Sequence, residues 1–149
     1  MRHIFSVAAF LLAAVTMTHA QILKPVKWSY GAKKISATEA MVFLKATIDD
    51  GWHVYSQHVK EGGPVPTSVK FEKSPDYLPV GKTAEPKPIV RMEPTFNMKV
   101  GFYEKSVIFQ QKIKLKKGQV TVQGSINYMT CNDKQCLPPE NVKFNIPIN

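Results

Sequence analysis

Apolar and polar residues alternate one by one in several short runs of this chain, and that pattern limits the folds open to it. The runs lie at 42–48, 67–71, 109–115 and 120–128. Because successive side chains of a β-strand point to opposite faces, each run predicts a strand with one buried face. In the longest run the predicted buried face carries Val120, Val122, Gly124, Ile126 and Tyr128.

Turn-forming residues separate these runs. They occur at Asp49-Asp50-Gly51, Glu61-Gly62-Gly63-Pro64, Lys116-Lys117-Gly118 and Leu137-Pro138-Pro139. Many short strands at this spacing are typical of an antiparallel sandwich. We therefore expect an all-β fold with a single domain.

Two other segments bear on the fold. Residues 37–44 are the only candidate for a helix, but their β-branched and aromatic content favours a strand. The segment 74–94 carries five prolines. Proline cannot donate to a hydrogen-bond ladder, so we expect this segment to form a sheet edge or a long loop.

The N-terminus has the pattern of an export signal. Arg2 and His3 precede an apolar run over 4–15, and Thr18-His19-Ala20 ends in a small residue of the kind at which such signals are cleaved. The run is too short for a confident membrane span, which needs about 20 apolar residues. We expect residues 1–20 to be a cleaved signal peptide and residues 21–149 to be one exported domain, with no membrane insertion after processing.

The charge of the chain is strongly basic, with a formal net charge of +9. After residue 20 almost all of the positive charge is lysine, and Arg91 is the only arginine. Lysine is a hydrated point charge that does not grip phosphate in a bidentate manner. We interpret the lysines as a solvated face and expect no nucleic-acid partner. Contact with an acidic partner or a membrane surface is the alternative.

The candidate chemistry lies in two cysteines, Cys131 and Cys136, the only two in the chain. As a structural disulfide they would close a short loop, which adds less chain-entropy stabilisation than a long one. As a zinc site they would need two more ligands, and after residue 20 only His53 and His58 are available besides carboxylates. Inert free thiols do not suit an exported protein. We expect no metal and no other cofactor.

The remaining interpretation is a redox pair that cycles between dithiol and disulfide. A small loop would hold both sulfurs close, so that the second thiol resolves a mixed disulfide formed by the first. The Cys-x-x-Cys motif at a helix start is absent, so no helix N-terminus would acidify the thiol, although Lys134 lies within the loop. Spacing alone leaves the redox pair and the structural disulfide equally open.

Three segments resemble one known family. Tyr128-Met129-Thr130-Cys131 through Cys136-Leu137-Pro138-Pro139-Glu140 is similar to the active-site segment of the N-terminal periplasmic domain of DsbD, the transmembrane thiol:disulfide interchange protein. Asp50-Gly51-Trp52-His53-Val54-Tyr55 resembles the family's Asp-Gly-aromatic-x-x-Tyr strand, and Phe102-Tyr103-Glu104-Lys105-Ser106 resembles its cap loop. The resemblance spans nearly the whole chain after residue 20.

The resemblance implies an immunoglobulin-like β-sandwich in the periplasm that relays electrons. Cys136 matches the cysteine that forms mixed disulfides with partners, and Cys131 matches its resolving partner. Phe102, Tyr103 and Glu104 match the cap loop, whose aromatics cover the disulfide and move aside when a partner docks. The alternative is that Phe102 and Tyr103 are core residues.

Other residues are candidates for lining the site, namely Trp52, Tyr55, Tyr128, Asp133 and Lys134. For Trp52 and Tyr55, core packing is the alternative. The chain also departs from the family. The family pattern has five residues between its cysteines and this chain has four, and Val100 and Gly101 replace the acidic residues before the cap aromatics. Glu104 or Asp133 are the candidate substitutes for that carboxylate.

The resemblance thus predicts a thiol:disulfide oxidoreductase that passes reducing equivalents between a membrane-linked reductase and oxidised exported proteins. The donor would be a thioredoxin-like or membrane-embedded thiol reductase, and the acceptors would be oxidised periplasmic thiol proteins. Because the chain ends after the β-domain, we expect these partners to be encoded separately. The alternative function is an exported β-sandwich binding module whose disulfide is inert.

Overall fold

A computed structural model describes residues 21–149, so the predicted signal peptide lies outside the described residues. These residues form eleven strands and no helix. The strands are β1 (Val26–Lys34), β2 (Glu39–Ile48), β3 (His53–Tyr55), β4 (Ser68–Phe71), β5 (Tyr77–Ala84), β6 (Ile89–Glu93), β7 (Met98–Tyr103), β8 (Ser106–Leu115), β9 (Val120–Tyr128), β10 (Thr130–Cys131) and β11 (Glu140–Ile148). No segment of this part of the chain is a helix long and apolar enough to cross a membrane.

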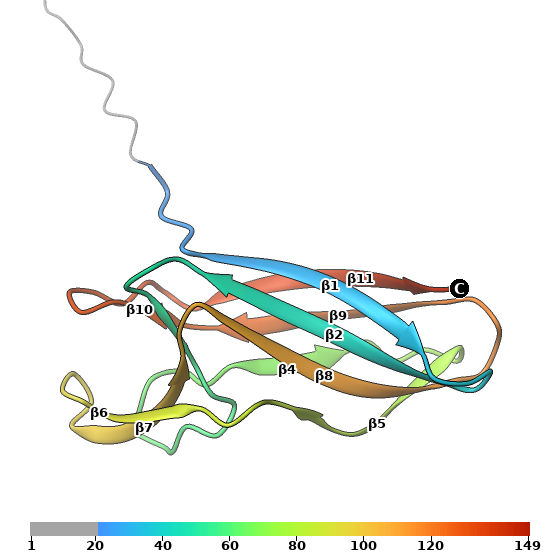
Figure 1. Ribbon diagram of the computed structural model, residues 1–149, viewed down its shortest axis with the longest axis horizontal. Helices are drawn as coiled ribbons and strands as arrows, with labels where there is room; N and C mark the ends of the chain where they lie inside the picture. Colours follow the sequence, from blue (N-terminus) through green and yellow to red (C-terminus); the bar gives the residue numbers. More distant parts are fainter. Residues whose placement is uncertain (1–20) are drawn as a thin grey trace, which may run out of the picture.

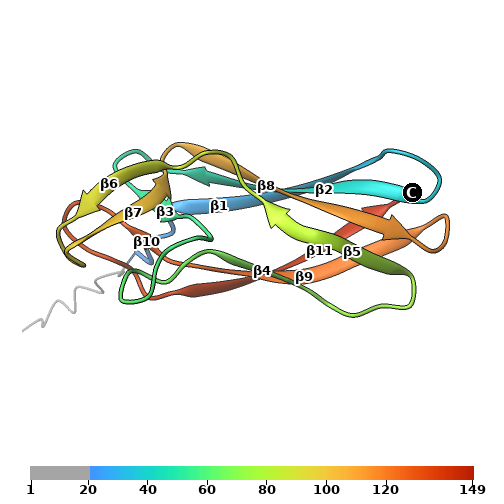
Figure 2. The ribbon, with the colours of Figure 1, turned by 90° about the horizontal axis from the view of Figure 1, so that it is seen from below.

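The strands form three antiparallel sheets. One sheet has the order β1-β2-β8-β5 and another has the order β11-β9-β4. These two sheets form the two layers of an elongated sandwich (Figures 1 and 2). The third sheet, in the order β10-β3-β7-β6, lies at one end of the sandwich, opposite the C-terminus.

The main core lies between the two long layers, where the alternating runs bury one face each. Fully or almost fully buried side chains come from β2 and β8 on one side and from β9 and β11 on the other; they include Val42, Leu44, Phe109, Ile113, Val122, Ile126, Phe144 and Ile146. All five residues predicted for the buried face of 120–128 are buried, and β9 has the predicted bounds. The all-β, antiparallel prediction is confirmed.

The proline-rich segment forms two edge strands, as expected. β5 is the edge of its sheet next to β8, and β6 is the edge of its sheet next to β7. The predicted turns also fall between strands, and Gly51 and Gly62 adopt φ angles of 83° and 86°. Such positive values favour glycine because it has no Cβ.

Two connections place the third sheet at its end of the sandwich. The turn after β2 leads directly into β3, and β9 continues through Met129 into β10. β10 pairs with β3 so that Cys131 lies opposite His53. β3 in turn pairs with β7, with Tyr55 opposite Phe102. The pairing of these short strands brings the cysteine segment beside the predicted cap segment.

Candidate functional site

The two cysteines face each other across a tight hairpin. Cys131 ends β10 and forms an isolated antiparallel bridge with Cys136, and their sulfurs are bonded at 2.07 Å. Asn132 organises the turn between them: its side-chain oxygen accepts hydrogen bonds from the backbone N–H groups of Lys134 and Gln135, at 2.9 and 2.8 Å. Asparagine commonly stabilises turns in this way. The four-residue spacing therefore suits a hairpin that holds both sulfurs together.

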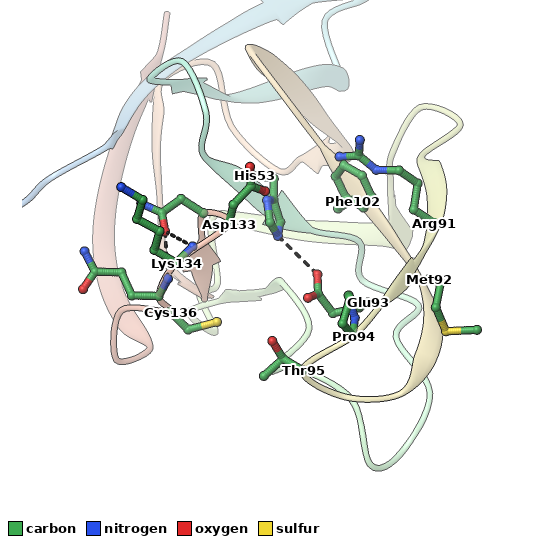
Figure 3. A pocket seen from close by; sticks show the side chains of 12 residues that line it. His53, Arg91, Met92, Glu93, Pro94, Thr95, Phe102, Asp133, Lys134 and Cys136 are labelled. Atoms are coloured by element: carbon green, nitrogen blue, oxygen red, sulfur yellow. Dashed lines mark hydrogen bonds and ion pairs between the residues drawn. The ribbon is translucent and has the colours of Figure 1, made fainter.

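The two cysteines differ in exposure. Cys131 is buried, with 2% of its surface exposed, whereas Cys136 is only partly buried. Cys136 lines an open pocket of about 650 Å³ between its hairpin and the β6–β7 hairpin. Figure 3 shows its sulfur directed into the space that faces Thr95 and Glu93. A reagent in this pocket would meet Cys136 before Cys131.

Phe102 packs beside the buried cysteine. It is 2% exposed and forms a small apolar cluster with Tyr55, Val100 and Cys131, against which Cys136 also packs. The Tyr55 hydroxyl reaches the ring of His53, and burial raises the pKa of Tyr55 well above its ordinary value, with Glu93 contributing further. Of the predicted lining residues, Tyr55 therefore lies in the cluster that surrounds the disulfide.

The structure separates the residues predicted for the cap loop. Phe102 belongs to the cysteine cluster, whereas Tyr103 points from the other face of β7 into the main core and packs edge-on against Phe109. The Tyr103 hydroxyl donates a hydrogen bond of 2.6 Å to the Pro86 carbonyl. Glu104 follows in the β7–β8 turn and accepts a hydrogen bond of 2.7 Å from Arg91. Tyr103 thus has the core position that the sequence left open as the alternative.

The other predicted lining residues divide in the same way. Asp133 and Lys134 line the pocket from the cysteine hairpin. Trp52 is partly buried and packs against the main core. Tyr128 lies in the main core, 5.4 Å from the Trp28 ring centroid, and its hydroxyl donates a hydrogen bond to Glu140 at 2.6 Å. Burial, followed by that hydrogen bond, raises the pKa of Tyr128 well above its ordinary value.

Three titratable residues of the pocket were not predicted for the redox site: His53, Arg91 and Glu93. The sequence indicated His53 only as a possible zinc ligand. In the structure its Nε2 atom lies 3.7 Å from Oε2 of Glu93. Arg91 extends over Phe102, with its guanidinium carbon 4.4 Å from the ring centroid. Among residues 21–149 no group of three or more His, Cys, Asp and Glu side chains is arranged to hold a metal ion.

Glu93 is a pocket carboxylate that the sequence did not single out, whereas Glu104 and Asp133 were the expected ones. Glu104 is engaged with Arg91 and is not a pocket residue, whereas Asp133 and Glu93 both line the pocket. No local pattern marks Glu93, because it lies in the proline-rich segment, and the pairing of β6 with β7 brings it to the site. The site therefore combines a disulfide with an imidazole and two carboxylates.

Comparison with known proteins identifies a family. The family model described as "Thiol:disulfide interchange protein DsbD, N-terminal" matches residues 19–147. No curated protein matches the sequence significantly.

Two solved structures show a similar fold. The N-terminal periplasmic domain of ScsB from Proteus mirabilis matches with a TM-score of 0.59 and 21% identity, over 78% of this chain and 43% of that chain. The chain thus spans less than half of that protein's length. The reduced N-terminal domain of DsbD from Neisseria meningitidis matches with a TM-score of 0.52 and 17% identity, over 80% of this chain and 85% of that chain. The expected immunoglobulin-like β-sandwich is confirmed.

Proposed function

Because this chain belongs to the family of DsbD N-terminal domains, we propose that it is a thiol:disulfide oxidoreductase that relays electrons through Cys131 and Cys136. The observation that carries the proposal is the unequal exposure of two bonded sulfurs. Cys136 faces an open pocket, and Cys131 is buried behind it. A disulfide that only fastened a hairpin would not require one sulfur to face a pocket.

The exchange proceeds in two substitutions at sulfur. In the reduced protein, the Cys136 thiolate attacks the disulfide of an acceptor protein, forms a mixed disulfide and releases the acceptor's other sulfur as a thiolate. The Cys131 thiolate then attacks Cys136 Sγ, closes the internal disulfide and releases the acceptor's second thiolate. Two electrons pass to the acceptor, and the two released thiolates take up protons. A donor dithiol restores the reduced pair by the reverse steps.

Phe102 controls access in this proposal. Its ring belongs to the buried cluster that contains Cys131, and the Arg91 guanidinium lies over the ring. Access to sulfur is one determinant of the exchange rate, so a small thiol attacks the disulfide at the pocket-facing Cys136 and not at the buried Cys131. A docking protein that displaces the ring would also gain access to Cys131. Glu104 supports this arrangement through its hydrogen bond to Arg91.

The proposed partners are proteins with reactive thiols in the periplasm. The donor is a thioredoxin-like or membrane-embedded thiol reductase, and the acceptors are oxidised periplasmic proteins. In this proposal residues 1–20 direct export and residues 21–149 are the working domain. The Cys136 Sγ atom, at the pocket surface, is the sulfur that each partner reaches first.

The test is to trap the mixed disulfide. Reduced Cys131→Ser protein, incubated with an oxidised acceptor protein, should accumulate a covalent complex through Cys136, because this chain no longer carries the thiol that would release the acceptor. The Cys136→Ser variant is the matched control and should form little complex, since Cys131 is buried. Mass spectrometry after thiol trapping identifies the cysteine involved.

A second measurement separates the relay from an inert disulfide. The wild-type pair, equilibrated in thiol redox buffers, should exchange between its two states at a potential near those of cellular dithiols. A potential below about −300 mV is typical of structural bridges. That value, with no trapped complex for either variant, would instead support the binding module with an inert disulfide.

A further inference from the structure

His53 lies directly across the sheet from the buried cysteine. In the antiparallel pairing of β10 with β3, Cys131 and His53 are opposite one another. Directly opposed side chains share one face of a sheet, with Cβ atoms about 4.5–5.5 Å apart. The Thr130 hydroxyl donates a hydrogen bond of 2.8 Å to the His53 carbonyl, which holds this register. The imidazole also lines the pocket that Cys136 faces.

The surroundings of His53 suit a proton acceptor. Burial lowers the pKa of His53 below its ordinary value, against the raising effect of the Glu93 carboxylate, so the ring is neutral near pH 7. Its Nε2 atom lies 3.0 Å from the Tyr55 hydroxyl and 3.7 Å from Glu93 Oε2. A tautomer with its proton on Nε2 leaves Nδ1 free to accept another. The other charged groups that act on the ring are Arg91, Glu104 and Asp133.

The resolving step creates a need for such a base. Cys131 must become a thiolate before it can attack the mixed disulfide at Cys136. A thiol with 2% exposure ionises with difficulty, because burial disfavours the charged form. No helix N-terminus within residues 21–149 is present to stabilise that charge. The nearest group able to take the proton at neutral pH should therefore control this step.

We propose that His53 accepts the proton of the Cys131 thiol during the resolving step and that Glu93 positions the ring and stabilises its charged form. The step is balanced as follows. Neutral His53 takes the proton from Cys131, and the resulting thiolate attacks Cys136 Sγ. The Cys131–Cys136 bond forms, the bond from Cys136 to the partner breaks, and the partner leaves as a thiolate. The imidazolium then returns its proton to that thiolate or to water.

This proposal rests on the proposed exchange function, and Ellman's reagent tests it without a protein partner. The reduced protein should release thionitrobenzoate in two phases, one as Cys136 forms a mixed disulfide and one as Cys131 closes the pair. The protein dithiol is oxidised and the reagent's disulfide is reduced to two thiolates. In His53→Gln the second phase should slow by about tenfold or more, in line with the loss of a general base.

The pH profile of the second phase provides a readout that a purely structural role would not change. In the wild type the rate of the second phase should stay constant as the pH is lowered, until the imidazole becomes protonated below about pH 6.5. In His53→Gln it should already be falling at pH 8.5 and continue to fall below it, because burial raises the pKa of the unassisted Cys131 thiol above its ordinary value of about 8.5. His58→Gln is the matched control, because the His58 side chain is 75% exposed. That variant should keep the wild-type rate and profile.

Glu93→Gln gives an independent test at a residue outside the core. It should slow the second phase by about two- to fivefold, the range expected for a partly exposed ion pair. If His53→Gln and Glu93→Gln both behave like His58→Gln while the wild type shows two phases, His53 is not the base and the relay stands. If the wild type releases only one equivalent, the pair does not close, and both the relay and the role of His53 are refuted.

Discussion

The guanidinium carbon of Arg91 lies 4.4 Å from the centroid of the Phe102 ring. The same guanidinium donates a hydrogen bond of 2.7 Å to Glu104, in the turn that follows Phe102. Arg91 therefore connects the edge strand β6 to the segment beside the disulfide. Because Phe102 packs against Cys131, this contact links a surface residue to the buried sulfur.

Removal of the guanidinium should loosen the cover over the disulfide. We expect Arg91→Ala to increase the rate at which dithiothreitol reduces the Cys131–Cys136 bond by about two- to fivefold, the factor that corresponds to an exposed cation–π contact. The free energy of unfolding should fall by about 1 kcal/mol or less, because the ion pair is exposed. Thiol trapping over time measures the reduction. Glu104→Gln removes only the ion pair and should have the smaller effect; equal rates in all three proteins would contradict the role of Arg91.

Loss of the Phe102 side chain should have a larger effect on access. Phe102→Ala should speed reduction of the disulfide by dithiothreitol more than Arg91→Ala does, because the ring shares the buried cluster of Cys131 and lines the pocket that Cys136 faces. It should also destabilise the fold by about 3–5 kcal/mol. Phe144→Ala is the control for that destabilisation, since Phe144 is as deeply buried as Phe102 and lies in the main core, outside the cluster of the disulfide. Reduction that accelerates equally in both variants would mean that general loosening, and not the ring, governs access.

Tyr128 precedes the cysteine segment but belongs to the core. Tyr128→Phe should lower the free energy of unfolding by about 1 kcal/mol, through the loss of its hydrogen bond to Glu140. It should leave both phases of the reaction with Ellman's reagent unchanged, because the ring still packs against Trp28. Urea unfolding measures the first effect. A changed rate of the second phase would show that Tyr128 takes part in the redox site.

The pH dependence of stability should show the environment of His53. Its pKa is lowered in the folded state, mainly by burial. As the pH falls below about 6.5, the imidazole is protonated in the unfolded chain while it is still neutral in the folded protein. The free energy of unfolding therefore decreases with falling pH, until the pH reaches the lower pKa of the folded ring. We expect the urea midpoint to fall from pH 7.0 to 5.5 more steeply in the wild type than in His53→Gln. His58→Gln should keep the wild-type slope; a wild-type slope in His53→Gln would contradict the buried, neutral ring.

The strands that were predicted well are those with one clearly buried face. β2, β8 and β9 alternate strictly, because one face of each strand packs on the main core while the other face is more exposed. β1 did not stand out in the sequence, since most of its residues are exposed or only partly buried. β6 is exposed along most of its length and lies in the proline-rich segment. β6 is a strand because it pairs with β7, and no sequence pattern within the segment indicates that pairing.

The sequence identified the two cysteines of the site but not the polar residues around them, His53 and Glu93. The cysteines are marked by type and by spacing, and the family resemblance added Phe102 beside them. His53 and Cys131 come together through a strand register that joins residues far apart in the chain. Glu93 reaches the pocket through the register of β6 with β7, where it pairs with Met98. The sequence pointed instead to Glu104 and Asp133, which lie close along the chain to the cap aromatics and to the cysteines.

Among the glycines, Gly124 is the one at which an added Cβ atom would make the closest contacts. A Cβ atom at this position would lie 2.4 Å from Cζ of Phe144 and 2.2 Å from the backbone oxygen of Lys70. The aromatic ring can shift, but the oxygen belongs to the neighbouring strand β4, which pairs with β9 at this position. An alanine here would therefore separate β4 from β9.

Gly124→Ala should lower the free energy of unfolding by about 1–3 kcal/mol or more, the range for overpacking in a core. The effect should appear as a lower urea midpoint. Gly118→Ala is the matched control: its added Cβ would meet nothing within 4 Å, and it lies in the turn between β8 and β9. The control should change stability by less than about 0.5 kcal/mol. Equal midpoints for the two variants would show that β4 does not approach β9 as closely as described, and the inner face assigned to β9 would need revision.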